Sequence, residues 1–223
     1  MCTIAVKKFG AKLPDNFEEY IKTAFTSQRD GIGIAIKIKT ENVVRVRRSV
    51  DGPTPVIETF NEVLKILENK KLDTTDDMAI IIHGRLGTSG KATNLNVHPF
   101  KIDRTATRPR TSKMDDHETF GVNSTAITEC SVFAHNGVIF EFSGHEKYCD
   151  TLIFGASVLA KKYVSEIDFE KLPGKIAILT PYANDNVYLT PNFVKDTNSE
   201  LLLSNSSCVP RDKKDYDYSG YYY

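Results

Sequence analysis

The sequence lacks an excess of charge of either sign and a long apolar run. Its 29 Lys and Arg residues balance 29 Asp and Glu residues, so the charge gives no indication of binding to nucleic acid or to an anionic membrane. No apolar run is long enough to cross a bilayer, and the N-terminus has no apolar signal-peptide core. We therefore expect a cytoplasmic protein that has neither a nucleic-acid nor a membrane partner.

The sequence also lacks closely spaced cysteines. Cys2, Cys130, Cys149 and Cys208 have no metal-type spacing, and without a secretion signal they predict reduced thiols. We therefore expect no metal and no organic cofactor. A chain of 223 residues is long enough for one large domain or two small ones.

Apolar residues recur at both helical and strand spacing, in mixed clusters along the chain. The continuous apolar run 78–82 predicts a strand that is buried on both faces. The order of elements predicts an α+β protein with two mainly antiparallel sheets layered between helices. The expected helices begin at 13–16 and span 55–71 and 150–163, and the expected strands span 2–8, 31–38, 43–50, 78–82, 132–134, 175–179 and 187–190.

Cys2 follows Met1 directly. Removal of Met1 would place a thiol and a free α-amine on one residue, and the amine could then take the thiol proton while the thiolate attacks a carbonyl. A free α-amine has a pKa of about 7.7–8.0, which suits a base near neutral pH. Taken alone, Cys2 is better explained as a small apolar residue that opens a strand, because a free Cys is usually buried and inert.

Two further segments lie at the ends of predicted strands and carry groups that could bind a substrate or stabilise an oxyanion. Arg85 and Thr88 follow the strand at 79–82, where a guanidinium can hold a carboxylate through two hydrogen bonds. Asn136 and Gly137 end the strand at 132–134, and a side-chain amide beside a Gly N–H can stabilise an oxyanion. The alternative for Asn-Gly is an ordinary hairpin turn.

Asp150 opens the predicted third helix, directly after Cys149. It could cap the helix by accepting hydrogen bonds from the first N–H groups. It could equally face the ammonium group of a substrate, and the spacing does not decide between the two.

These residues together resemble class II glutamine amidotransferase domains, which are N-terminal-nucleophile hydrolases. The His135-Asn136-Gly137 element is the most specific part, and Asp30-Gly31-Ile32-Gly33 is similar to a stretch of the stand-alone members. The resemblance covers residues 2–190, and it rests on Cys2, His83-x-Arg85 with Thr88, Asn96-x-His98-Pro99-Phe100, Phe133-Ala134-His135-Asn136-Gly137 and Asp150-Thr151, which occur in the order and rough spacing of the family.

The resemblance implies a four-layer αββα sandwich and hydrolysis of the glutamine side-chain amide. Cys2 would attack the amide carbon with its own α-amine as base. Asn136 and the Gly137 N–H would form the oxyanion hole. A thioester would remain until water releases glutamate, and the ammonia would pass to a separate synthase or ligase.

The resemblance also assigns the substrate-binding groups. Arg85, with help from Thr88, would hold the α-carboxylate of glutamine, and Asp150 would hold its α-ammonium. Three departures from the family pattern stand out: Leu86 replaces an aromatic residue, no Arg-Gly loop supports a role for Arg29, and a long segment replaces the short hairpin that family members have between Phe100 and His135.

The predicted organisation is a domain over 2–190 followed by an extension over 191–223, whose Tyr-rich end we expect to be mobile. The long, locally basic segment 101–128 is either a solvated loop or a lid or docking surface for an acidic partner. Two other functions stay open. One is a linear amidase that uses an N-terminal Cys on another C–N amide, and the other is a non-catalytic glutamine-binding subunit.

Overall fold

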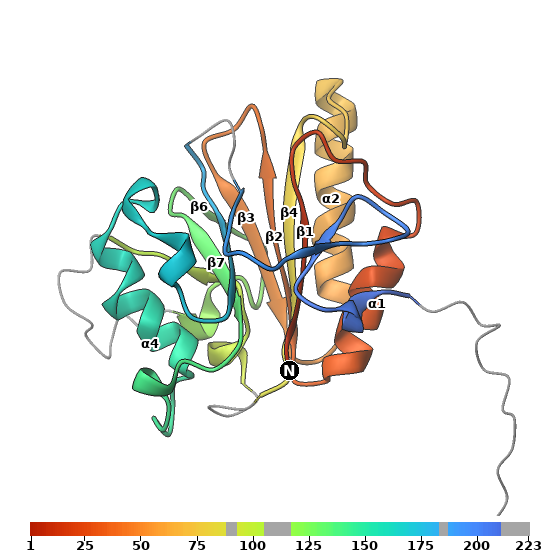
Figure 1. The fold of residues 1–223 in the computed structure, drawn as a ribbon. Helices are drawn as coiled ribbons and strands as arrows, with labels where there is room; N and C mark the ends of the chain where they lie inside the picture. The colour runs from red at the N-terminus through yellow and green to blue at the C-terminus, as the bar shows by residue number, and fades with distance from the viewer. Residues whose placement is uncertain (88–92, 105–116, 183–186, 211–223) are drawn as a thin grey trace, which may run out of the picture.

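The computed structural model describes residues 1–87, 93–104, 117–182 and 187–210. Over these residues the chain is a mixed α+β protein with two antiparallel sheets, which confirms the predicted class (Figure 1). The larger sheet has the strand order β10-β11-β1-β4-β2-β3-β6, and the smaller has the order β5-β7-β8-β9. The strands are β1 (Thr3–Lys7), β2 (Ile32–Ile38), β3 (Val44–Ser49), β4 (Met78–Gly84), β5 (Phe100–Lys101), β6 (Ala126–Thr128), β7 (Val132–Asn136), β8 (Lys175–Leu179), β9 (Val187–Leu189), β10 (Val194–Lys195) and β11 (Leu202–Leu203).

The apolar run at 78–82 forms the central strand β4 of the larger sheet. All seven of its residues are buried, as predicted for a strand that is covered on both faces. It pairs with β1 on one side and with β2 on the other, and Ile82 lies opposite both Ala5 and Ile34. Strands β2 and β3 form the predicted hairpin.

Helices α1 (Phe17–Gln28) and α2 (Thr54–Lys70) cover the outer face of the larger sheet (Figure 1). Their apolar stripes pack on every second residue of the strands, which gives one buried cluster. Each fully buried Leu, Ile or Phe of such a cluster stabilises the fold by about 1.5–3 kcal/mol. No helix among the described residues has the length and apolarity needed to cross a bilayer.

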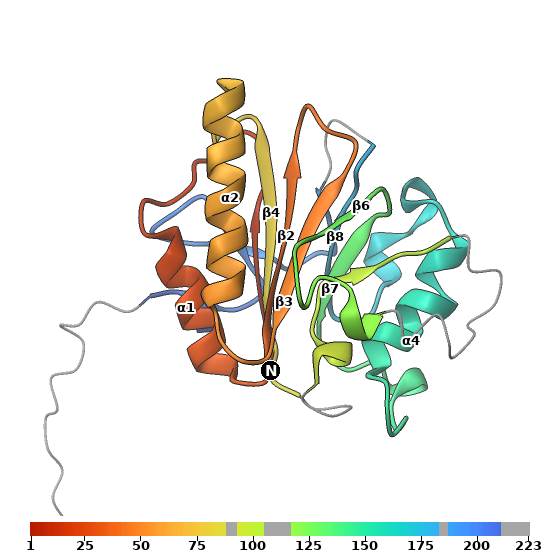
Figure 2. The same cartoon turned by 180° about the vertical axis from the view of Figure 1, so that it is seen from behind.

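Helix α4 (Asp150–Ser157) covers the outer face of the smaller sheet (Figure 2). It ends at Ser157 instead of residue 163, and the chain continues through the short 3₁₀ turn η3 (Leu159–Lys161). Leu159 and Ala160 stay buried in that turn. The apolar spacing therefore continued past the end of the helix, and it did not reveal the change of backbone conformation.

A third buried cluster lies between the two sheets. It takes the residues of β1, β3, β4, β7 and β8 that point away from the helices. Because side chains alternate along a strand, one set of residues packs under the helices and the other set meets the opposing sheet. The members include Ile4, Val6, Ala79, Ile81, Val132, Ala134, Ala177 and Leu179.

The segments that the sequence analysis set apart contribute to the larger sheet. Residues 191–210 supply β10 and β11, and β11 pairs directly with β1. Leu201, Leu203 and Cys208 join the cluster under α1 and α2. From segment 101–128, residues 126–128 form the edge strand β6, while 105–116 and the Tyr-rich end lie outside the described residues.

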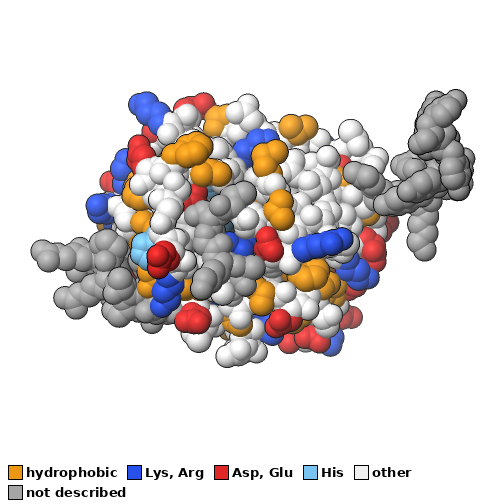
Figure 3. Space-filling model, turned by 90° about the horizontal axis from the view of Figure 1, so that it is seen from below, with side chains coloured by type: hydrophobic (Ala, Val, Ile, Leu, Met, Phe, Trp, Pro, Cys, Tyr) orange, Lys and Arg blue, Asp and Glu red, His pale blue; other side chains and the backbone are white. Residues whose placement is uncertain are grey.

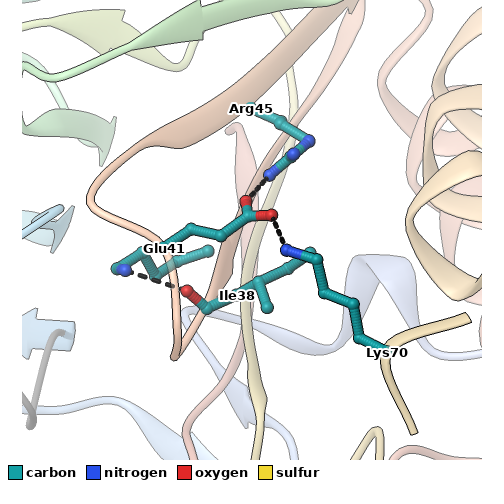
Figure 4. A network of polar contacts seen from close by, with 5 residues as sticks. Ile38, Glu41, Arg45 and Lys70 are labelled. Atoms are coloured by element: carbon teal, nitrogen blue, oxygen red, sulfur yellow. Dashed lines mark hydrogen bonds and ion pairs between the residues drawn. The ribbon is translucent and has the colours of Figure 1, made fainter. Parts of the chain in front are cut away.

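Glu41 joins the β2–β3 hairpin to the end of α2 (Figure 4). Its carboxylate pairs with Arg45 and, at 2.7 Å, with Lys70. Partial burial alone would raise the pKa of Glu41, but the hydrogen bonds from both cations outweigh it and leave the pKa below its ordinary value.

Replacement of Glu41 by glutamine should therefore lower the free energy of unfolding by roughly 1 kcal/mol at pH 7. Because the pKa of Glu41 is lowered in the folded state, its contribution is present above its unfolded pKa and is lost on acidification. Urea unfolding of the two proteins at pH 7 and pH 3 measures this. An equal difference at both pH values would contradict it.

Candidate functional site

Cys2 and Arg85 lie side by side at one end of the larger sheet. Cys2 comes two residues before Ile4, so strand alternation turns it toward the space between the sheets. Thr3 pairs with Gly84 of β4 in antiparallel register, which sets Cys2 opposite Arg85. Backbone pairing alone thus brings the predicted nucleophile and the predicted carboxylate-binding cation together.

The thiol of Cys2 is held by the backbone of Leu86. The thiol group donates to the Leu86 carbonyl, and the Leu86 N–H donates to the sulfur, each at 3.4 Å. Burial raises the pKa of Cys2, while the Leu86 hydrogen bond and the charge of Arg85 oppose the shift. The group is therefore a thiol at rest and needs a base, and the N–H of Leu86 and Arg85 favour the thiolate once it forms.

The loop that carries Arg85 and Leu86 is fixed by Asp30. The Asp30 carboxylate accepts the Gly87 N–H at 2.6 Å, and the Asp30 N–H donates to the Arg85 carbonyl at 3.1 Å. A Cβ at Gly87 would lie 2.8 Å from a guanidinium nitrogen of Arg85. Because Gly87 has no side chain, it leaves room for the buried guanidinium of Arg85. Thr88, the other predicted member of this loop, lies outside the described residues.

Asn136 is the last residue of β7, on the side that faces the larger sheet. Its side chain shares that face with Val132 and Ala134, and its amide nitrogen donates to the Ser204 hydroxyl at 2.9 Å. The chain does not turn back after Gly137 as a two-residue hairpin but continues into the 3₁₀ turn η2 (Phe140–Phe142). The hairpin alternative for this Asn-Gly pair is therefore wrong.

Gly137 has a backbone conformation that residues with a side chain rarely adopt. Its φ is +155°, and a Cβ there would lie 2.9 Å from Nε2 of His135. Only glycine meets both conditions without strain. The pair Asn136-Gly137 thus ends the strand with a backbone N–H next to a side-chain amide.

Asp150 is the first residue of α4, and both of its oxygens accept backbone hydrogen bonds. The Ile139 N–H donates to Oδ2 at 2.6 Å, and the Thr151 N–H donates to Oδ1 at 2.8 Å. Its charge is among those that act on the Cys2 thiol. The carboxylate therefore links the start of α4 to the segment after Gly137. The N-cap of α4 is Cys149, so Asp150 is not the N-cap residue that the sequence suggested, and these bonds do not decide whether it faces a substrate ammonium.

Buried histidines lie behind the site. The rings of His83 and His98 stack with centroids 4.0 Å apart, and the His135 N–H donates to Nδ1 of His98 at 3.3 Å. Burial lowers the pKa of His83 to about 3, that of His135 to about 4 and that of His98 well below its ordinary value. These rings are neutral at pH 7. In the described part of the chain the hydrogen bonds of the Cys2 sulfur go to Leu86, and none comes from a histidine.

Two residues beyond the predicted domain also contact the site. Ser204 binds Asn136, and the Asn205 side chain donates to the Cys2 carbonyl at 2.7 Å. No motif marked them, because they lie about 200 positions from Cys2 in sequence and meet it only through the pairing of β11 with β1. Asp30 was part of the quoted resemblance, but its contact with Gly87 was not predicted.

The surroundings of the site are mixed in character. Seen from the end of the molecule that carries the N-terminus, the described hydrophobic side chains lie in small groups among charged ones (Figure 3). A hollow of about 630 Å³ begins at Val138, directly after Gly137, and extends to Pro173 along α4. Its lining is mainly apolar and contains none of the predicted site residues.

Among the described residues, no three His, Cys, Asp or Glu side chains come together in a way that could hold a metal ion. The chain matches no family model and no curated protein with which it was compared.

Proposed function

We propose that this protein hydrolyses the side-chain amide of glutamine through a thioester on Cys2, as a member of the class II glutamine amidotransferases. The observation that carries the proposal is the convergence of Cys2, Arg85 and Asn136 from three strand ends at one edge of the space between the sheets. The three supply a nucleophile, a cation and an oxyanion donor. A zwitterionic amino acid with a side-chain amide needs this combination.

The layering supports the same proposal. Three buried clusters separate α1 and α2 from the larger sheet, the larger sheet from the smaller, and the smaller sheet from α4. The order helix, sheet, sheet, helix is what the N-terminal-nucleophile hydrolase fold requires. In that arrangement the first strand, here β1, carries the nucleophile at its N-terminal end, at the edge of the space between the sheets.

Met1 must be removed before the reaction can start, and it is 80% exposed and so accessible to an aminopeptidase. The new α-amine of Cys2 takes the thiol proton, and the sulfur attacks the amide carbon of glutamine. The negative charge that develops on the amide oxygen is accepted by the Asn136 side chain and the Gly137 N–H. The protonated amine gives its proton to the leaving nitrogen, ammonia departs, and water cleaves the thioester to release glutamate.

Recognition of glutamine would use two opposite charges. Arg85 is 3% exposed, so a hydrogen bond from its guanidinium to the α-carboxylate is little weakened by water. Asp150 is 5% exposed, and its oxygens can accept from the α-ammonium in addition to their two backbone donors. In this proposal the product ammonia passes to a separate synthase or ligase.

Ammonia release from glutamine, together with the intact mass of the native protein, tests the proposal. We expect a mass that lacks Met1 and equal amounts of glutamate and ammonia. An N-acyl amino acid serves as the second substrate and identifies a linear amidase if it is cleaved instead. Binding of glutamine without ammonia release, from a protein that lacks Met1, would overturn the hydrolytic proposal in favour of a binding subunit.

Replacement of Arg85 by lysine should raise the KM for glutamine by about 10- to 100-fold with a smaller effect on kcat, because a lysine cannot form the two parallel hydrogen bonds. Steady-state kinetics measure both constants. Arg29→Lys is the matched control, because Arg29 is exposed and lies outside the site, and it should change neither constant. An unchanged KM in Arg85→Lys would exclude Arg85 from substrate binding.

A further inference from the structure

The Ser204 hydroxyl lies between the first strand and the predicted oxyanion hole. It accepts the Ile4 N–H at 2.8 Å and the Asn136 amide nitrogen at 2.9 Å. The Ser204 N–H donates in turn to the Ile4 carbonyl at 2.9 Å. Ser204 is 3% exposed, so these bonds compete with little water. One side chain thus joins the strand that carries Cys2 to the residue that would stabilise the oxyanion.

The next residue adds a second tether to the nucleophile. The Asn205 amide nitrogen donates to the Cys2 carbonyl at 2.7 Å, and Lys175 of β8 donates to the Ser204 carbonyl. The pair Ser204-Asn205 therefore contacts the nucleophile, the first strand, the smaller sheet and the oxyanion amide. Both residues come from the segment after β11, which lies outside the catalytic domain predicted over 2–190.

The orientation of the Asn136 amide depends on this contact. A side-chain amide has two N–H groups on one side and a carbonyl on the other, and rotation by 180° exchanges them. Only the N–H side can stabilise an oxyanion. In the rotation that the structure shows, one N–H bonds to the Ser204 hydroxyl and the second N–H is left for another acceptor.

We propose that Ser204 is a positioning residue that keeps the N–H side of Asn136 directed at the oxyanion. The inference rests on the proposed amide hydrolysis and extends the machinery to the C-terminal segment. Ser204 does not touch the substrate in this assignment. It acts through Asn136, so its effect should appear in turnover and not in binding of glutamine.

The test compares Ser204→Ala with the native protein in three measurements. The kcat for ammonia release from glutamine should fall by roughly 10-fold, which is less than the 10²–10³ that follows loss of an oxyanion donor itself. The KM should stay within about 2-fold. The rate of Cys2 alkylation by iodoacetamide, followed by peptide mass, should not change, because displacement of iodide forms no oxyanion.

Matched variants separate positioning from general damage. Ser206→Ala removes an exposed hydroxyl two residues away and should leave all three values unchanged. Ser204→Thr keeps the hydroxyl and should retain most of the native kcat. Ser204→Val has the shape of the Thr variant without the hydroxyl, and its kcat should fall as in Ser204→Ala. If Ser204→Ala fails to fold after the loss of the acceptor for Ile4, Ser204→Cys takes its place, because its sulfur can still accept the Ile4 N–H weakly. In an Asn136→Ala background, Ser204→Ala should add no further loss.

The outcomes distinguish the two proposals. A native protein that lacks Met1 and releases no ammonia from glutamine overturns amide hydrolysis and this inference together. A native protein that is active, with Ser204→Ala as active as Ser206→Ala, overturns the inference alone. Equal losses in kcat and in alkylation rate, or a full additional loss in the Asn136→Ala background, would also overturn it, because they would show that Ser204 supports Cys2 or the fold in general.

Discussion

Cys2→Ala is expected to abolish ammonia release from glutamine. Loss of the proposed nucleophile would remove the covalent route entirely, and such losses lower turnover by on the order of 10⁶-fold. The fold should be unaffected, because Cys2 is only half-buried and its sulfur makes two weak hydrogen bonds with Leu86. Glutamine should still bind, since Arg85 and Asp150 are unchanged. Ammonia assays and calorimetric titration with glutamine measure the two properties.

The matched control is Cys130→Ala. Cys130 is also a free, half-buried cysteine, so it corrects for the general loss of a thiol. It should leave ammonia release at the native level. Residual activity in Cys2→Ala that equals the activity of Cys130→Ala would contradict the assignment of Cys2 as nucleophile. A native protein that keeps Met1 should be inactive like Cys2→Ala, because its α-amine is then separated from the thiol by one residue.

Acidification from pH 7 to pH 5 is expected to destabilise the protein strongly. His83, His98, His117 and His135 are four of its five histidines, and all are buried. Burial lowers the pKa of His83 and His117 to about 3 and that of His135 to about 4, and it places the pKa of His98 well below its ordinary value. Each ring is therefore neutral at pH 5 in the folded state.

The loss of stability at low pH follows from the unfolded chain, in which a histidine has a pKa near 6.5. Below that pH the unfolded state binds protons that the folded state does not, so stability falls as the pH decreases and levels off near the folded pKa values. Each histidine then costs about 2 kcal/mol between pH 7 and pH 5. Four together cost about 7–8 kcal/mol, which is comparable to the whole stability of a typical domain.

Urea unfolding at pH 7, 6 and 5 measures this loss. His117→Phe provides the internal comparison, because the ring of His117 already packs edge-on against Phe100 and its Nδ1 has no hydrogen-bond partner among the described residues. This variant should lose about 2 kcal/mol less than the native protein between pH 7 and pH 5. Equal stability of the native protein at pH 7 and pH 5 would show that these histidines are charged in the folded state.

The alternation of apolar and charged residues predicted the strand that contains Arg48, but not the burial of its side chain. The alternation over 43–50 predicts the strand β3, and this is confirmed. It does not indicate that Arg48 is fully buried. The guanidinium donates to the carbonyls of Val97 and Phe120, at 2.8 and 2.7 Å, and to that of His117. A guanidinium can be buried when its donors find acceptors, and these acceptors lie in segments that no local pattern connects to β3.

The sequence by itself determined the parts of this protein that depend on neighbouring residues. The apolar spacing predicted β4, the β2–β3 hairpin, α1 and α2, because side-chain burial repeats with the period of each element. It also put the candidate groups Arg85 and Asn136 at the ends of predicted strands. Sequence order could then suggest a site without any knowledge of distance.

Only the tertiary structure decided which distant segments complete that site. The antiparallel pairing of Thr3 with Gly84 sets Cys2 opposite Arg85, and the pairing of β11 with β1 brings Ser204 to Asn136. Such pairings depend on the register of whole strands in a sheet. Register is fixed by burial across many residues at once, and a serine near the C-terminus has no local feature that reveals it.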